Sequence, residues 1–258
     1  MKRMRSALAV LCVAAAVFTT VSAGADELAL TGRQIVSKNQ DAIVTAQLVV
    51  KTNVSYEGQE MPPQEEKIEA NAVIIDPNGL AVTPLSEISP EESMSDFLGE
   101  EADKYKVSTD ITDVKLLLVN GQEIPATIVL RDKELDLAFL RPVTKPEKPL
   151  AAVDLAKAGK PELLDQVLAL SRQGVAANRA IAASFDRIET VVEKPRFFCI
   201  PDQGLDMGAS VFTLDGSFAG LVVMRQIASA ADTASWYDNS AQIILAPADI
   251  REAAKQAP

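Results

Sequence analysis

The chain has 258 residues, of which 48% are hydrophobic and 24% are charged, and its formal net charge is −11. This composition is that of a folded globular protein and not of a disordered chain, and the length allows one or two domains. The sequence contains no histidine, so it cannot form a serine–histidine–aspartate hydrolytic triad.

The first 25 residues have the pattern of a secretory signal peptide. Three basic residues precede an apolar run at 7–18, and small residues follow it. This run is shorter than the about 20 apolar residues of a transmembrane helix, which leaves an uncleaved anchor as the weaker interpretation. We therefore expect an exported protein, periplasmic or secreted, that is cleaved after Ala23 or Ala25 and is not inserted in a membrane afterwards.

Loss of this segment would leave 22 basic and 36 acidic residues, a net charge of −14. Such a surface repels phosphate groups, so we expect no binding to nucleic acid or to anionic membranes. Cys199 would then be the last cysteine, without a disulfide partner, and its apolar neighbours predict a buried, inert thiol. One cysteine without histidine excludes a structural zinc site, and no calcium-loop motif is present. We expect no metal and no cofactor.

Short strands dominate the expected elements of the first half. A helix is expected at 28–39, and 54–66 is expected to be a hairpin tip or loop. The residues Asp76-Pro77-Asn78-Gly79 and Asn120-Gly121 predict tight turns between strands, and the acidic stretch 89–113 predicts a long connection. The expected strands are 42–50, 68–75, 80–83, 114–119, 123–130 and 135–141.

The second half repeats this pattern after a linker rich in proline and lysine at 144–149. A final helix at 247–255 has proline in its first turn. Many short strands between terminal helices predict an all-β protein of two small barrels. The expected organisation is a signal peptide at 1–23, an N-terminal β-barrel at 24–143, the linker, and a C-terminal β-barrel with a terminal helix at 150–258. The expected strands are 166–170, 180–192, 196–200, 209–214, 217–224 and 242–246.

Four segments carry a resemblance to a known family. They read IIDPNGLAVTPLS at 74–86, LDLAFL at 135–140, LDMGASVFTLDG at 205–216 and ILAPADI at 244–250. In order and spacing they resemble the protease domain of the HtrA/DegP family, over residues 28–256. The resemblance implies the trypsin-like fold of two six-stranded β-barrels, and no residues are left for the PDZ domain that the family usually appends.

The resemblance places the catalytic triad of the family at Ser86, Asp136 and Met207. Ser86 stands where the family has its histidine, and Met207 stands where it has the nucleophilic serine. The oxyanion positions of the family fall on Leu205, in place of glycine, and on Asp206, whose carboxylate would oppose a developing negative charge. The resemblance therefore implies a pseudoprotease with no catalytic residue. Met207 is expected to pack in the core or cleft, and Asp136 to bond nearby backbone or Ser86.

A relocated nucleophile is the main alternative. Ser210 would begin a strand and Ser171 would end one, but neither has a lysine close in sequence to form a catalytic dyad. Another alternative is a structural subunit of an envelope assembly, with the acidic stretch 89–113 as its contact.

In the resembled family, substrate adds as an extended strand beside the segment that corresponds to 220–225. Val222, Val223, Met224 and Arg225 are therefore the expected peptide-binding edge, and strand addition needs no triad. The loop 228–240, which contains Trp236 and Tyr237, could instead cover this edge. We expect a non-catalytic module that binds a peptide or protein partner or acts as a scaffold. The oligomeric state is left open.

Overall fold

A computed structural model describes residues 20–89, 105–226 and 240–258. The chain divides into two compact units, residues 1–38 and residues 39–258. The described part of the first unit is the helix α2 (Thr20–Asn39), which begins eight residues before the expected start at residue 28. In the described part of the chain, no helix has both the length and the apolar character needed to span a bilayer.

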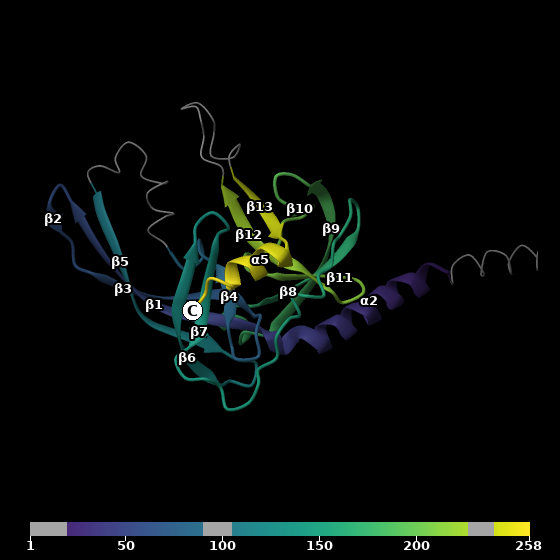
Figure 1. Ribbon diagram of the computed structural model, residues 1–258, viewed down its shortest axis with the longest axis horizontal. Helices are drawn as coiled ribbons and strands as arrows, with labels where there is room; N and C mark the ends of the chain where they lie inside the picture. Colours follow the sequence, from purple (N-terminus) through teal and green to yellow (C-terminus); the bar gives the residue numbers. More distant parts are fainter. Residues whose placement is uncertain (1–19, 90–104, 227–239) are drawn as a thin grey trace, which may run out of the picture. The chain divides into compact units, whose positions relative to one another are not determined.

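The first half of the second unit forms a six-stranded antiparallel barrel (Figure 1). Its strands follow the order β1-β3-β4-β7-β6-β5, and β1 closes the barrel by pairing with β5. A two-residue strand, β2, extends the sheet beside β1. The strands are β1 (Ile43–Tyr56), β2 (Gln59–Glu60), β3 (Gln64–Ile74), β4 (Ala81–Pro84), β5 (Tyr105–Leu117), β6 (Glu123–Asp132) and β7 (Leu137–Pro142).

The second half forms another closed barrel, in the order β10-β13-β12-β11-β8-β9. Two strands of it, β9 and β10, close the barrel by pairing with each other. Its strands are β8 (Gln166–Arg172), β9 (Ile181–Val192), β10 (Phe198–Pro201), β11 (Ser210–Thr213), β12 (Phe218–Gln226) and β13 (Ser240–Leu245). The helical elements in the described residues of this unit are η1 (Gln40–Ala42), η3 (Val175–Ala177) and α5 (Pro247–Ala254). The expected fold class, a trypsin-like double β-barrel, is confirmed.

Turn chemistry explains why the strands reverse where they do. The carboxylate of Asp76 accepts a hydrogen bond from the N–H of Asn78 at 2.7 Å, and Gly79 follows in the left-handed region with φ of 95°. At the next predicted turn, the side chain of Asn120 accepts a hydrogen bond from Gln122 N–H at 2.9 Å. Both predicted turns are confirmed, because aspartate and asparagine can bond to the backbone two residues ahead.

Each barrel encloses its own apolar core. Strands of the first barrel point alternate residues inward, and Val44, Ala46 and Leu48 of β1 are fully buried. Residues of β8, β11 and β12 form the corresponding cluster in the second barrel. The connection between the barrels covers 143–165 and includes the expected linker. Leu150 and Val153 in it donate hydrogen bonds to Pro77 and Ile74 of the first barrel, both at 2.9 Å.

Candidate functional site

The positions at which the resembled family has its triad lie at the ends of three strands. Ser86 follows β4, and Asp136 lies just before β7. Because β4 and β7 are antiparallel neighbours, with Pro84 opposite Leu137, these two residues meet at one end of the strands. Met207 lies before β11 of the second barrel.

Asp136 is a buried carboxylate that binds both barrels. Its Oδ1 accepts a hydrogen bond from Ser86 N–H at 2.7 Å, and its Oδ2 accepts one from Ser86 Oγ–H at 2.9 Å. The same Oδ2 accepts a third bond from Met224 N–H of β12 at 2.9 Å. The residue is 7% exposed, with φ of 54°, a left-handed conformation that aspartate tolerates better than most residues. The predicted hydrogen bonds of Asp136 to the backbone and to Ser86 are confirmed.

A second carboxylate stands next to this group. Glu87 follows Ser86 directly and keeps an exposed surface. Desolvation by the surrounding protein, together with the negative charge of Asp136, raises the pKa of Glu87. A carboxyl group with a raised pKa thus lies next to Ser86 in the sequence and within the field of Asp136.

Met207 is held between the two barrels. Its carbonyl oxygen accepts a hydrogen bond from the side chain of Asn71, on β3, at 3.1 Å. Its side chain packs against the core of the second barrel, as expected. The following residue, Gly208, lies so close to β3 that a Cβ there would be 2.6 Å from Asn71 O. Glycine is needed at 208 because the backbones of the two barrels touch at this position.

The side-chain amide of Gln242, on β13, forms hydrogen bonds with both backbone groups of Leu205. Its Oε1 accepts a hydrogen bond from Leu205 N–H at 2.7 Å, and its Nε2 donates to Leu205 O at 2.6 Å. The same amide group reaches Met207 Sδ at 3.6 Å. Leu205 is the position at which the resemblance places the first oxyanion donor. The N–H of Leu205 is therefore already bonded to a side chain of the protein itself.

Sequence reasoning did not identify Gln242 as part of this site. The residue lies in an expected strand, without any neighbouring motif. Only the register of the second barrel, in which Met224 of β12 pairs with Gln242, places its side chain beside Leu205. No local sequence signal could have found it.

A family model, the trypsin-like peptidase domain, matches residues 18–221 of the chain. The match covers both barrels except for the end of β12, β13 and α5. The chain belongs to the trypsin-like peptidase domain family. A search of curated proteins gives no match.

Asp206, the other residue that the resemblance places at the oxyanion site, uses its carboxylate within the second barrel. Asp206 Oδ2 accepts a hydrogen bond from Ser171 Oγ–H at 2.7 Å, at the end of β8. Ser171 is buried at 4% exposure, and Ser210 is fully buried with no hydrogen-bond partner for its hydroxyl in the described part of the chain. Both serines proposed as relocated nucleophiles thus lie below the surface of the trypsin-like domain.

Most backbone groups of the expected peptide-binding edge already form hydrogen bonds within the trypsin-like domain itself. Val222 exchanges hydrogen bonds with Gly208 and Ala209, both at 2.9 Å, and Met224 N–H is bonded to Asp136. Val222 and Val223 are buried, and β12 pairs with β13 as far as Gln226. The backbone groups expected to be open are therefore engaged from Val222 to the N–H of Met224. Peptide binding at this edge stays a prediction.

The other expected residues have simpler surroundings. Arg225 lies over the ring of Phe198, with 5.1 Å between the guanidinium carbon and the ring centroid. Trp236 and Tyr237, which belong to the loop considered as an alternative cover for the edge, lie outside the described residues. Burial raises the pKa of Cys199 to about 11, which keeps its thiol protonated at neutral pH. Within 20–89, 105–226 and 240–258, no cluster of carboxylate and cysteine side chains is arranged to hold a metal.

Side chains also join the barrels of the trypsin-like domain next to the site. Asn71 Oδ1 accepts a hydrogen bond from Arg172 N–H at 2.6 Å, and the Arg172 side chain donates to Ile43 O at 2.8 Å. Arg179 forms a bidentate ion pair with Glu69 of β3. The hydrogen bonds of this arginine lower the pKa of Glu69. These contacts hold β1 and β3 of the first barrel against the end of β8 and the residues that follow it.

Proposed function

We propose that this trypsin-like domain is an HtrA-like pseudoprotease that acts in the cell envelope as a peptide- or protein-binding or scaffolding module. The observation that carries the proposal is the occupied N–H of Leu205, which donates to Gln242 at 2.7 Å. An oxyanion donor must be free to point at the charge that develops during peptide hydrolysis. Here that donor serves the protein's own structure.

The chemistry of the neighbouring residues supports the same proposal. In a serine–histidine–aspartate triad, the histidine takes the proton of the nucleophile and later returns it to the leaving group. Ser86 cannot take this role because a hydroxyl is no base near neutral pH, and its proton is donated to Asp136. Met207 offers a thioether and no nucleophilic oxygen. The three positions thus provide hydrogen bonding and packing.

A hydrolase with a relocated nucleophile remains the rival function. The 2.7 Å bond between Ser171 Oγ and Asp206 Oδ2 pairs a hydroxyl with a carboxylate, and this arrangement favours it. Ser171 is buried, however, and an aspartate is a weak base for a serine at neutral pH. The other rival, a structural subunit, depends on the acidic stretch 89–113, most of which lies outside the described residues.

Binding by strand addition would use the end of β12 that follows the bond between Met224 and Asp136. On the side away from β13, β12 pairs with β11 only as far as Leu221. The backbone beyond Met224 N–H then has no strand partner on that side among the described residues, and Gln226 is exposed. An extended peptide can pair with such an edge through backbone hydrogen bonds alone.

One experiment with two readouts tests binding without cleavage. A fluorescein-labelled library of extended peptides is incubated with the full chain, and anisotropy reports binding while mass spectrometry reports cleavage. A serine-reactive phosphonate is added in parallel. We expect bound peptides, no cleaved products and no phosphonate adduct. An adduct on Ser171 or Ser210, lost together with cleavage in Ser171→Ala or Ser210→Ala, would establish the hydrolase instead. Absence of both binding and cleavage would favour the structural subunit.

The place of action, the cell envelope, is inferred from the basic and apolar pattern of the first 25 residues. We expect the exported protein to begin at Gly24 or Asp26. The mass of the N-terminal peptide of protein recovered from the periplasm or medium checks this expectation. Recovery of an exported form with Met1 intact would contradict it.

A further inference from the structure

The longest strands of the first barrel continue past it as a three-stranded ribbon (Figure 1). In this ribbon, which consists of residues 50–69 and 105–113, β1 pairs with β5 as far as Tyr56 and with β3 as far as Thr52. A two-residue turn at Glu57 and Gly58 joins β1 to β2, and both residues have left-handed backbones, with φ of 48° and 83°. Such turns connect tightly paired antiparallel strands.

Two prolines interrupt the pairing near the end of the ribbon. Ser55 pairs with Glu60, and pairing resumes at Thr52 with Gln64. Three residues, Met61-Pro62-Pro63, therefore lie opposite two residues of β1, which is a bulge. The prolines have no N–H to donate to the ladder, so the chain moves away from β1 after the bond from Met61 N–H to Val54 O.

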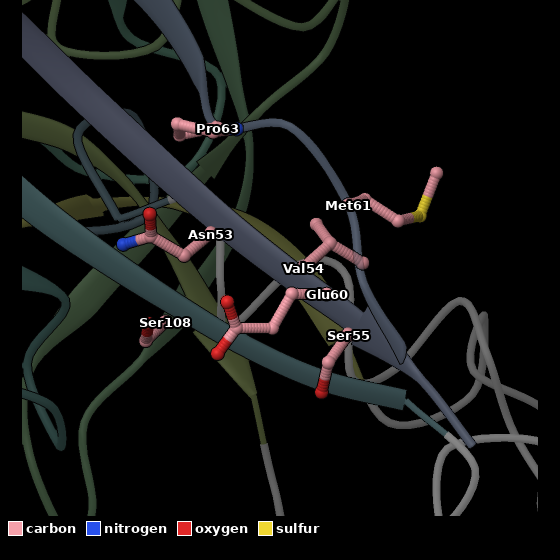
Figure 2. Close-up of a pocket in the computed structure, with 7 residues that line it drawn as sticks. All are labelled: Asn53, Val54, Ser55, Glu60, Met61, Pro63 and Ser108. Atoms are coloured by element: carbon pink, nitrogen blue, oxygen red, sulfur yellow. The ribbon is translucent and has the colours of Figure 1, made fainter. Parts of the chain in front are cut away.

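A hollow of about 430 Å³ lies at this bulge (Figure 2). Its lining combines apolar surface with hydrogen-bonding groups and one carboxylate. Figure 2 shows the Glu60 carboxylate reaching across β1 towards β5, on the side of Ser55 and Ser108. Among the described residues, the side-chain carboxylate of Glu60 has no hydrogen-bond or ion-pair partner. The lining residues are Asn53, Val54, Ser55, Glu60, Met61, Pro63 and Ser108.

The net negative charge of the ribbon favours a ligand with a positive charge. Its two segments contain seven acidic residues and three lysines. Such a surface attracts cationic groups and repels a second copy of the same ribbon. The amide of Asn53 donates to Asp110 Oδ2 at 3.4 Å, which leaves the oxygen of this amide as a further acceptor in the lining of the hollow.

We propose that this hollow binds a lysine or arginine side chain on an extended segment of a partner protein. The methylene stem would lie against the apolar part of the lining at Met61 and Pro63, and the cationic end would bind Glu60. A long side chain with an apolar stem and a charged tip matches a lining that is apolar on one part and acidic on another. The site is separate from the residues around Leu205 and does not depend on the proposed function of the cleft.

The test uses a fluorescein-labelled peptide of alternating threonine, lysine and arginine, titrated with the full chain at low salt. Glu60→Gln should weaken binding about tenfold, because a hydrogen-bonded charge pair is lost. Glu57→Gln is the matched control, since it removes the same charge three residues away, in the turn and outside the hollow. This control should stay within about twofold of the parent chain.

Each remaining outcome decides the proposal. A peptide with norleucine in place of lysine and arginine should bind about tenfold or more weakly to the parent chain and should not distinguish Glu60→Gln from it. Equal weakening by Glu60→Gln and Glu57→Gln would overturn the proposal, because the field of the whole ribbon would then explain binding. Failure of the basic peptide to bind the parent chain at all would also overturn it.

Discussion

Replacing Ser86 by histidine and Met207 by serine in the same chain is expected to leave peptide hydrolysis within about tenfold of the uncatalysed rate. A functional triad contributes up to about a millionfold in rate, so this double variant would be fast if the rest of the site were intact. Two observations argue that it is not. Gln242 holds the N–H of Leu205, and Asp206, which the resemblance places at the oxyanion site, carries a carboxylate that would oppose a developing negative charge.

The same reasoning predicts which further changes matter. Adding Leu205→Gly, Asp206→Asn and Gln242→Ala to the double variant should raise the rate about a hundredfold, the usual contribution of one oxyanion donor. Gln203→Ala is the matched control, because Gln203 is an exposed glutamine that does not bond to Leu205. Hydrolysis of a fluorogenic peptide measures each variant. Rapid hydrolysis by the double variant alone would show that the oxyanion site is functional as it stands.

Asp136→Ala is expected to lower the free energy of unfolding by about 3 kcal/mol or more. The change leaves three donors in a buried region without their acceptor, and each such loss costs about 1–3 kcal/mol. The midpoint of urea unfolding, followed by circular dichroism, measures the effect. If Asp136 served catalysis only, the free energy of unfolding would change little, because catalytic residues are seldom required for stability.

Three variants separate the causes of this loss. Asp136→Asn keeps the tolerance for φ of 54° but replaces one acceptor oxygen by a donor, so its cost should be intermediate. Ser86→Ala removes a single hydroxyl and should cost about 1 kcal/mol. Asp132→Ala is the matched control, since Asp132 accepts one bond, from Leu135 N–H at 3.0 Å, at a more exposed position. Equal stability of Asp136→Ala and Asp132→Ala would contradict the structural role of Asp136.

Strands and turns were predicted best where their cause is local. Asparagine or aspartate with a nearby glycine at 76–79 and 120–121 bonds to its own backbone, so these turns follow from neighbouring residues. The ribbon was predicted only in part, as a hairpin tip at 54–66, because the rest of its cause is distant. Residues 105–113 are polar and were expected to belong to a connection, yet they form part of β5 because residues 49–56 of β1 pair with them.

Chain composition alone determined that no histidine can serve as a base, whatever fold the chain adopts. Motif order also indicated the trypsin-like double barrel and placed Ser86 and Asp136 near each other. Only the tertiary structure decided what these groups do. Leu205 and Gln242 are 37 residues apart, and Asp136 and Met224 are 88 apart, so no local pattern joins them. Their bonds depend on strand register and on the packing of one barrel against the other, because a side chain can satisfy a distant backbone group only after both barrels have closed.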